Sequence, residues 1–407
     1  MSEPHTSWVI CQLGAREHYA VARALAAQNA LQSLITDAWV PNGHPLGWLR
    51  QSLRERFHPA LDGVRICAWT EATMRFELMA RLRGWRGWEA IILRNEWFQR
   101  RSVAALARLV HKGAARAGDG TVVFAYSYAA REILQFARSQ GWRTVLGQID
   151  PGPEEERIVT RLYEVSAEQR GQRKPAPMQY WKCWQQECRF ADRIVVNSEW
   201  SRRALCAEGV AREKIVIEPV AIEATTAAAG FQRCYPAEFS AARPLRALFL
   251  GQVNLRKGAG PLFEAIQLLR AEPIEFWIVG PLQLRVPAKL QGDARVRWIG
   301  TVPRGEASAY YRDADVFLFP TWSDGFGMTQ LEAQTWKLPV IASQYCGDVV
   351  RDGVNGLVLP EVSGKAIAAL LLECLRKPQM LVQFSNAAVT GQDLPIKRLG
   401  QHLLQLF

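Results

Sequence analysis

Residues 310–343 read YYRDADVFLFPTWSDGFGMTQLEAQTWKLPVIAS, and this stretch decides the fold. The apolar run VFLFP (316–320) predicts a buried strand, and LPVIAS (338–343) predicts a second one after an intervening helix. Between them, Gly325 and Gly327 predict a tight turn that leads into the helix. A strand, a helix and a strand in this order form the unit of a parallel sheet. Because ligands of such sheets bind beyond the carboxyl ends of the strands, the turn is the first candidate for a site.

The same alternation of apolar runs and helical patterns extends along the whole chain. Strands are predicted at 7–13, 31–36, 121–127, 143–149 and 193–198, and again at 246–251, 274–280, 296–300, 316–320, 338–343 and 356–360. Residues 223–244, rich in small side chains and carrying two prolines, separate the two series. A chain of 407 residues is too long for a single hydrophobic core. We therefore expect an α/β protein with an N-terminal domain (1–222), a linker (223–244) and a C-terminal domain (245–379).

The composition predicts a folded globular protein, with 49% apolar and 22% charged residues. The opening residues MSEPHTSWVICQLG lack the pattern of a secretion signal, and no apolar run approaches the roughly 18 to 20 residues of a membrane span. We therefore expect a cytoplasmic location. The eight cysteines show no zinc-like spacing, so reduced, buried thiols are expected.

Positive charge is concentrated in residues 50–116, which hold 14 Lys and Arg residues against 6 Asp and Glu. Within this segment, WLRQSLRERF and RFELMARLRGWRGW interleave arginines with aromatic and aliphatic side chains. This pattern is typical of a surface that meets anionic lipid headgroups at the inner face of a membrane. A solvated basic face is the alternative interpretation. No zinc-finger, basic-zipper or RNA-recognition pattern accompanies the charge, so nucleic acid is not an expected partner.

Two loops carry the candidate chemistry. After the strand at 246–251, Gly251 allows close approach of a ligand, and Arg256 and Lys257 provide two cations suited to a diphosphate. After the strand at 316–320, Asp324 and Glu332 bracket a turn whose backbone N–H groups suit an anion or a sugar hydroxyl. The alternatives are a solvated cation pair in the first loop and an ordinary helix cap in the second.

Several segments in the same order and spacing resemble retaining GT-B glycosyltransferases of family 4. They are FADRIVVNSEWSRRAL (190–205), LFLGQVNLRKG (248–258), WIVGP (277–281), VRWIGTVPRGE (296–306), the stretch 310–343 and DGVNGLVLP (352–360). Asp324 and Glu332 resemble the family's pair of acids separated by seven residues, although the first is usually glutamate. The resemblance implies two Rossmann-like domains facing each other across a cleft, with a C-terminal helix within 380–407 that crosses back to the first domain.

The resemblance also implies roles for particular residues. Arg256 and Lys257 would bind and neutralise the donor diphosphate, Glu332 the ribose and Asp324 a sugar hydroxyl, which makes these four the predicted catalytic residues. Further donor contacts are implied for Gly251, Pro281, Val302, Gly325, Phe326, Gly327, Met328 and Thr329. Gly14, Arg16, Glu17, His18 and Asp150 are implied to face the acceptor or the cleft. These assignments predict that the side chains of Arg256, Lys257 and Glu332 face one cavity.

Three local features of the sequence have interpretations of their own. Ala15 follows Gly14 where many relatives have a second glycine, and Ile149 precedes Asp150 where many have histidine, so the chain departs from the family's pattern at both loops, although Asp150 remains available. Glu154, Glu155 and Glu156 are explained by the dipole of a helix that begins after Gly152, and no catalytic role is predicted for them. Asp313 and Asp315 match a metal-binding pattern of another fold, but a chain-turning role is favoured.

We therefore predict a metal-independent, cofactor-free retaining glycosyltransferase of the kind used in polysaccharide biosynthesis. It would move a sugar from a nucleotide-sugar donor to a glycan or lipid-linked acceptor. A glycosidase would also carry paired carboxylates, but it would not need the Arg256 and Lys257 loop. The other alternative is a degenerate sugar- or membrane-binding module without turnover. The sequence does not identify the nucleotide, the sugar or the acceptor.

Overall fold

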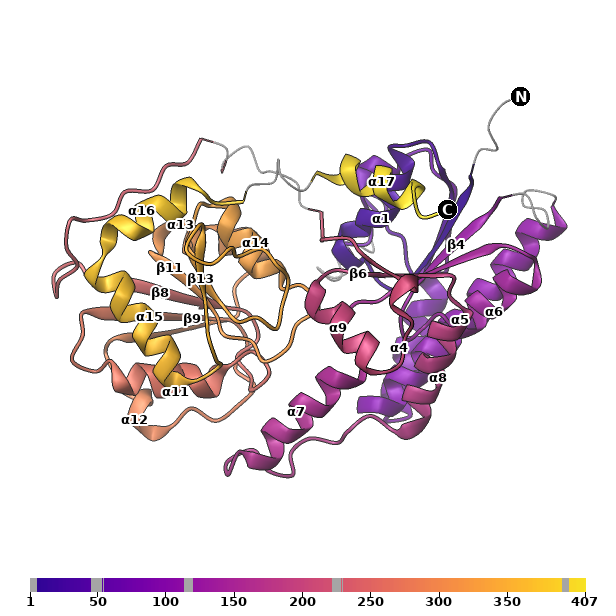
Figure 1. Cartoon of the computed structure of the whole chain (residues 1–407). Helices are drawn as coiled ribbons and strands as arrows, with labels where there is room; N and C mark the ends of the chain where they lie inside the picture. Colours follow the sequence, from indigo (N-terminus) through magenta and orange to yellow (C-terminus); the bar gives the residue numbers. More distant parts are fainter. Residues whose placement is uncertain are drawn as a thin grey trace.

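In the computed structural model of the chain, two lobes lie side by side, each built on a parallel β-sheet (Figure 1). The structure describes residues 6–44, 53, 55–112, 120–221, 228, 230–389 and 395–407. Part of the predicted linker (223–227 and 229), part of the basic segment (50–52, 54 and 113–116) and part of the C-terminal segment (390–394) lie outside these residues.

The sheet of the N-terminal lobe has the strand order β3-β2-β1-β4-β5-β6-β7, and every neighbouring pair is parallel. Its strands are β1 (Trp8–Gln12), β2 (Leu31–Thr36), β3 (Ile66–Ala68), β4 (Val122–Tyr126), β5 (Arg143–Gly147), β6 (Arg193–Val196) and β7 (Ile215–Ile217). The five predicted strands of this half are confirmed. The outer strands β3 and β7, of three residues each, were not predicted.

The sheet of the C-terminal lobe repeats this arrangement with the order β10-β9-β8-β11-β12-β13, again with parallel neighbours throughout. Its strands are β8 (Leu245–Leu250), β9 (Ile274–Val279), β10 (Val296–Gly300), β11 (Val316–Phe319), β12 (Val340–Ala342) and β13 (Gly356–Val358). All six were predicted. They stand out in the sequence because both faces of the sheet are covered, which makes the strands almost continuously apolar.

Helices cover both faces of each sheet (Figure 1). In the N-terminal lobe they are η1 (Arg16–Tyr19), α1 (Ala20–Ala26), η2 (Pro59–Leu61), α4 (Thr70–Leu82), α5 (Gly87–His111), α6 (Arg131–Ser139), α7 (Pro153–Val165), α8 (Met178–Phe190), α9 (Glu199–Ala207) and η3 (Arg212–Lys214). In the C-terminal lobe they are α11 (Ala259–Leu268), α12 (Ala288–Gln291), α13 (Arg304–Asp313), α14 (Met328–Thr335), α15 (Gly364–Arg376) and α16 (Pro378–Asn386). Among the described residues, none of the helices combines the length and apolarity needed to cross a bilayer.

Successive side chains of each central strand enter different cores. In β1, Val9 and Cys11 belong to the core under α5, α6 and α8, whereas Trp8 and Ile10 pack on the other face with α1. This alternation is the two-residue period of a strand buried on both sides. It fixes the strand register firmly, because a slip by one residue would exchange the two sets of side chains.

Each sheet changes its direction of winding at one point, between β1 and β4 in the first lobe and between β8 and β11 in the second. Loops that leave neighbouring strands in opposite directions open a crevice at such a point, where ligands of doubly wound sheets bind. The candidate loops identified from the sequence follow β1, β5, β8 and β11. The topology therefore brings them to the facing edges of the two sheets.

The chain ends on the lobe in which it began (Figure 1). The single helix expected over 380–407 is instead two helices, α16 on the C-terminal lobe and α17 (Ile396–Leu404), which packs on α1. Gly400 makes this packing close, because a Cβ atom there would lie 2.5 Å from the carbonyl oxygen of Ala24. Leu399 and Leu403 on α17 are buried in the core that also contains Trp8.

We predict that Gly400→Val destabilises the protein by about 1–3 kcal/mol, because the added side chain must push α17 away from α1. Chemical denaturation followed by circular dichroism measures this change. Gln401→Val is the matched control, since residue 401 is exposed on the same helix and carries the same cost of a β-branched side chain. Equal unfolding midpoints for the two variants would contradict the close packing.

Candidate active site between the lobes

Hydrogen bonds hold the loop after β8 against the loop after β11. The carbonyl oxygen of Arg256 accepts from the N–H of Trp322 at 2.8 Å and from the hydroxyl of Thr321 at 3.1 Å. In return, the Arg256 guanidinium donates to the carbonyl oxygen of Ser323 at 2.9 Å. Arg256 and Lys257 are therefore held as fixed cations rather than as mobile surface side chains.

Asp324 lies between these two cations. Its carboxylate accepts a hydrogen bond from the Lys257 ammonium, and the Arg256 guanidinium lies 3.7 Å from Oδ2. Burial alone would raise the pKa of Asp324, but the charges of Lys257 and Arg256 outweigh burial and hold it below its ordinary value. The predicted cations and the first predicted acid thus form one ion cluster in the C-terminal lobe.

Glu155 extends the ion cluster into the N-terminal lobe. It comes from the first turn of α7, and its Oε2 lies 3.5 Å from Nη1 of Arg256. Burial raises the pKa of Glu155 to about 7, with Arg256 opposing the rise and the nearby carboxylates of Asp150 and Asp324 adding to it. Within the described part of the chain, Oε2 of Glu155 accepts no hydrogen bond.

Asp150 follows β5 and is held by its own loop. Its Oδ1 accepts hydrogen bonds from the Tyr128 hydroxyl, from the N–H of Gly152 at 2.9 Å and from Nε2 of Gln148 at 3.2 Å. Burial raises the pKa of Asp150, while the Tyr128 hydrogen bond and the charges of Arg16 and Arg256 lower it in part.

The lobes touch at one side of the ion cluster. The hydroxyl of Ser198 donates to the carbonyl oxygen of Gly325 at 2.7 Å, and Nε1 of Trp200 donates to the hydroxyl of Ser323 at 3.2 Å. A Cβ atom on Gly325 would lie 2.1 Å from the carbonyl oxygen of Ile149. This position therefore requires glycine for the lobes to approach as closely as they do.

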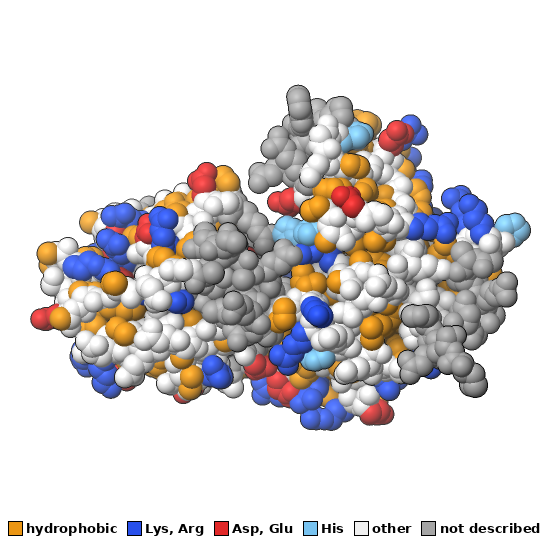
Figure 2. All heavy atoms as spheres, turned by 90° about the horizontal axis from the view of Figure 1, so that it is seen from above, with side chains coloured by type: hydrophobic (Ala, Val, Ile, Leu, Met, Phe, Trp, Pro, Cys, Tyr) orange, Lys and Arg blue, Asp and Glu red, His pale blue; other side chains and the backbone are white. Residues whose placement is uncertain are grey.

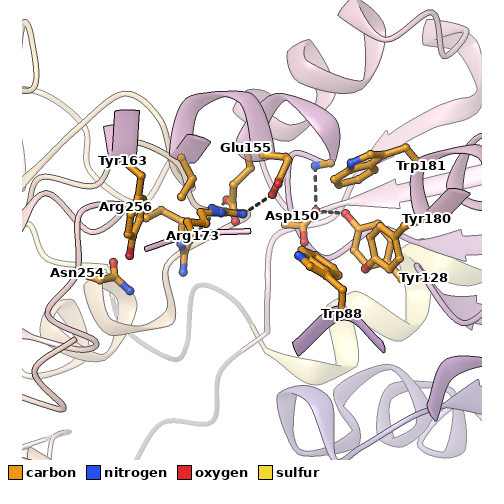
Figure 3. Close-up of a pocket in the computed structure, with 13 residues that line it drawn as sticks. Trp88, Tyr128, Asp150, Glu155, Tyr163, Arg173, Tyr180, Trp181, Asn254 and Arg256 are labelled. Atoms are coloured by element: carbon orange, nitrogen blue, oxygen red, sulfur yellow. Dashed lines mark hydrogen bonds and ion pairs between the residues drawn. The ribbon is translucent and has the colours of Figure 1, made fainter. Parts of the chain in front are cut away.

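A cavity of about 390 Å³ lies on the side of the ion cluster where β5 ends. We call it the aromatic cavity. Its walls are Trp88, Tyr128, Tyr163, Tyr180, Trp181 and Val159, together with Asp150, Gly152, Glu155, Glu156, Arg173, Asn254 and Arg256. Figure 3 shows four of the rings, those of Trp88, Tyr128, Tyr180 and Trp181, on one side and the C-terminal lobe's Arg256 and Asn254 on the other, with Glu155 between them. Both lobes contribute to this cavity.

A larger cavity of about 710 Å³ lies between the first turn of the N-terminal lobe and helices α13 and α14. Its lining includes Glu17, His18, Met328 and Glu332, and the Tyr311 hydroxyl donates to Oε2 of Glu332 at 2.9 Å. Seen from above, histidine side chains lie where the two lobes meet (Figure 2). We call this space the large cavity.

The strand-to-helix turn after β1 has an unusual backbone. Glu17, His18 and Tyr19 all have positive φ angles of 50°, 50° and 61°, a conformation that costs non-glycine residues free energy. The N–H of Gly14 donates to Asp37 at 2.9 Å, and Arg56 pairs with the same carboxylate, which anchors the start of the turn. The turn thereby directs Glu17 and His18 into the large cavity.

The structure distributes the predicted site residues over several places. Arg256 and Asp150 line the aromatic cavity, Glu332 and Met328 line the large cavity, and Lys257 lines neither. The expectation that Arg256, Lys257 and Glu332 share one cavity is therefore wrong for this structure. In this structure the Lys257 ammonium is paired with Asp324, and the Arg256 guanidinium is bound to the carbonyl oxygen of Ser323.

The remaining predicted residues lie around these cavities. Gly251, Pro281 and Val302 border neither of the two, and Phe326 is buried in a small apolar cluster with Val220, Leu331 and Val349. Gly327 caps the N-terminus of α14, Thr329 lies half-buried in its first turn, and Arg16 lies with its guanidinium 6.0 Å from the ring centre of Tyr126. Asp315, part of the metal-like pattern, is buried and accepts two hydrogen bonds from Arg243, so it has a structural role.

Sequence reasoning missed Glu155 and the aromatic residues. The sequence did contain a signal for the position of Glu155. Pro153 begins α7 after a short loop that follows β5, so the first turn of that helix must lie at the carboxyl edge of the sheet. Trp88, Tyr128 and Tyr180 carried no such signal, since they come from α5, a loop and α8 and meet only in the folded protein.

Comparison with known proteins supports the resemblance. Residues 244–377 match the family model described as Glycosyl transferases group 1. The amylovoran biosynthesis glycosyltransferase AmsK of Erwinia amylovora is 30% identical over 145 residues, covering 32% of this chain and 36% of that protein. A D-inositol 3-phosphate glycosyltransferase of Kineococcus radiotolerans is 30% identical over 233 residues, covering 48% and 51% of the two chains.

Solved structures agree with the fold over nearly the whole length. Anabaena Alr3699/HepE in complex with UDP-glucose has a TM-score of 0.60 at 14% identity and covers 98% of this chain and 99% of that one. A glycosyltransferase from Rickettsia africae has a TM-score of 0.64 at 14% identity, covering 98% and 97%.

The chain is thus an α/β protein with the GT-B fold. Its C-terminal lobe resembles the glycosyltransferases of group 1, as the sequence predicted. The matched regions span about a third to a half of the curated relatives.

We predict that Gly325→Ala separates the lobes, because a methyl group cannot occupy a point 2.1 Å from the Ile149 carbonyl oxygen. Loss of the hydrogen bond from Ser198 to Gly325 alone lowers the free energy that holds the lobes together by about 1 kcal/mol. Small-angle X-ray scattering should record a larger radius of gyration. Gly305→Ala is the control, since residue 305 is exposed in α13 with open space around it. Scattering curves that coincide for both variants would contradict the prediction.

Proposed function

We propose that this protein is a retaining, metal-independent glycosyltransferase of family 4 that moves a sugar from a nucleotide-sugar donor to a glycan or lipid-linked acceptor. The observation that carries the proposal is the fixed pair of cations, Arg256 and Lys257, facing the turn that precedes α14. Retention at the anomeric carbon rests on the resemblance of residues 310–343 to that family. A role in polysaccharide biosynthesis agrees with the relative that acts in amylovoran biosynthesis.

In this proposal the donor lies along the C-terminal lobe. Glu332, in the second turn of α14, accepts hydrogen bonds from ribose hydroxyls in the large cavity. The diphosphate takes the place of the Asp324 carboxylate on Lys257, and the N-terminus of α14 adds its dipole. Asp324, released from Lys257, accepts a hydroxyl of the donor sugar. The base lies towards Pro281 and Val302.

The chemistry requires charge to be stabilised where the diphosphate leaves. The acceptor hydroxyl oxygen forms a bond to the anomeric carbon, and the bond from that carbon to the diphosphate oxygen breaks. The electron pair of that bond goes to the diphosphate, which also receives the hydroxyl proton. The Arg256 guanidinium is held by the Ser323 carbonyl oxygen before the reaction, and Lys257 exchanges the Asp324 carboxylate for the diphosphate, so both cations are in place where the departing charge develops. In this mechanism the two side chains supply the positive charge that a metal ion would otherwise provide.

We predict that Lys257→Ala lowers kcat by about a hundredfold or more, the usual effect of removing one preorganised charge. A thermal-shift panel of nucleotide sugars, starting with UDP-glucose because a protein of the same fold was solved with it, selects the donor. Release of the nucleoside diphosphate then measures turnover.

Lys289→Ala, at an exposed lysine on α12 in the same lobe, is the control and should turn over normally. Normal turnover by Lys257→Ala would overturn the assignment. Binding of a nucleotide sugar by the unmodified chain without any turnover would favour the non-enzymatic alternative.

We further propose that the protein acts in the cytoplasm at the inner face of an anionic membrane, through α4 and the start of α5. Leu78, Met79 and Leu82 are exposed on α4, and Leu82 is 74% exposed. Arg81, Arg83 and Arg86 are exposed beside them. Aliphatic side chains surrounded by arginines suit an interface with acidic headgroups.

We predict that the protein floats with phosphatidylglycerol vesicles at low salt, that it floats less with phosphatidylcholine vesicles, and that 0.5 M salt releases it, because screening weakens attraction between charges. Leu82→Gln should reduce the bound fraction severalfold by removing an apolar anchor. Leu268→Gln, at a leucine that is 53% exposed on α11 of the other lobe, is the control. Equal flotation of the two variants would argue for a merely solvated basic face.

A further inference from the structure

The aromatic cavity has no role in the binding of the donor proposed above, yet it adjoins Arg256, the residue placed on the donor diphosphate. Its volume of about 390 Å³ falls within the range of small-molecule sites, roughly 300–1,000 Å³. Residues of both lobes close it, since Asn254 and Arg256 come from the loop after β8 and the other walls come from the N-terminal lobe. A ligand held there would therefore lie next to the ion cluster.

One wall of the aromatic cavity is a group of packed rings. Tyr128 stacks on Tyr180 with ring centres 5.0 Å apart and an interplanar angle of 24°, and Trp88 contacts Tyr180 at 4.9 Å. Glu187 fixes this wall, because its buried carboxylate accepts hydrogen bonds from the backbone N–H groups of Tyr128 and Ala130, both at 2.8 Å. Trp88 is held as well, by donation from its Nε1 to the carbonyl oxygen of Lys174 at 2.9 Å. The wall is a preformed, half-buried apolar surface rather than a set of mobile side chains.

Two carboxylates beside the rings offer hydrogen-bond acceptors. All three hydrogen bonds to the Asp150 carboxylate fall on Oδ1, and within the described residues none reaches its Oδ2. Oε2 of Glu155 is buried and likewise accepts no hydrogen bond from the described residues, although Arg256 lies 3.5 Å away. A buried carboxylate oxygen without a donor is costly, and a hydroxyl group of a ligand would satisfy it.

The charges of the aromatic cavity select against other ligands. Three carboxyl groups and two guanidinium groups line it, and Arg173 is already paired with Glu156. A phosphate-bearing ligand would meet an excess of carboxylates, and an acyl chain would bury them without partners. An uncharged ring with several hydroxyl groups and an apolar C–H face satisfies both the aromatic rings and the carboxylates.

We propose that the aromatic cavity binds the acceptor and that the acceptor presents an uncharged pyranose ring there. The C–H face of the sugar lies on Tyr180 and Trp88, and its hydroxyls donate to Asp150 and Glu155. The reactive hydroxyl then lies beside Arg256, on the side of the donor diphosphate. This inference rests on the proposed function and names the acceptor class of the same site.

The test uses the full-length chain, the nucleotide sugar selected by thermal shift, and a panel of uncharged p-nitrophenyl hexopyranosides as acceptors. Mass spectrometry detects the disaccharide product, and initial rates give the acceptor KM. We expect at least one pyranoside to accept the sugar. Tyr180→Leu should raise the KM for that pyranoside about tenfold, and Glu155→Gln should lower acceptor kcat/KM by roughly tenfold to a hundredfold, because each removes a direct contact to the acceptor.

Controls separate this inference from the function on which it rests. Glu154→Gln makes the same change as Glu155→Gln one residue away, outside the aromatic cavity, and should transfer normally. Glu155→Gln keeps the size of the side chain, which makes it informative even if Tyr180→Leu folds poorly. Thermal shift with the nucleotide sugar should show that the donor still binds to each variant.

Two results would overturn the proposal while leaving the glycosyltransferase assignment intact. One is donor turnover with transfer only to phosphorylated pyranosides or to none of the panel. The other is transfer with unchanged acceptor kinetics in both Tyr180→Leu and Glu155→Gln. Failure of every nucleotide sugar to bind would instead refute the proposed function itself.

Discussion

The ion cluster of Lys257, Asp324, Arg256 and Glu155 is the constraint on which the arrangement between the lobes depends. Buried charges are tolerated only when they are paired, because removing an ion from water costs far more than an ordinary contact returns. Three of these groups belong to the C-terminal lobe, and Glu155 belongs to α7 of the N-terminal lobe. The Arg256 guanidinium thus faces carboxylates of both lobes, so the strength of its ion pairs depends on how closely the two lobes approach each other. Any anion entering the site must compete with a carboxylate for one of the cations.

Two cavities lie where the lobes meet. Gly325 lies against the backbone at Ile149, and Arg256 and Glu155 of the ion cluster line the aromatic cavity. The large cavity, on the side of α13 and α14, contains Glu332 and the turn after β1, while the aromatic cavity holds Asp150, Glu155 and the stacked rings. The proposed reaction joins the two sides, because the diphosphate binds where the Asp324 carboxylate now lies. In this proposal the Asp324 carboxylate stays paired with Lys257 until the donor binds.

The similarity to known proteins is distributed unevenly along the chain. The family model matches residues 244–377, which hold the cations, the pair of acids and the loops proposed to border the base, whereas the aromatic wall lies outside this range. In our proposal the matched part of the chain binds the donor, and the rings of Trp88 and Tyr180 bind the acceptor. Fold similarity at 14% identity spans both lobes and shows a shared scaffold.

The sequence by itself determined the parallel sheets, the order of the chemistry-bearing loops and the ion-pairing groups of the C-terminal lobe. Strands buried on both faces are apolar throughout, and a loop after a strand in such a sheet can lie only at its carboxyl edge. Only the tertiary structure decided that Lys257 faces Asp324 rather than Glu332, that Glu155 reaches Arg256, and that rings from α5, α8 and the loop after β4 form one wall. These contacts join residues far apart in the chain. They depend on the packing of whole elements and on how closely two lobes approach, for which no local pattern of residues provides a signal.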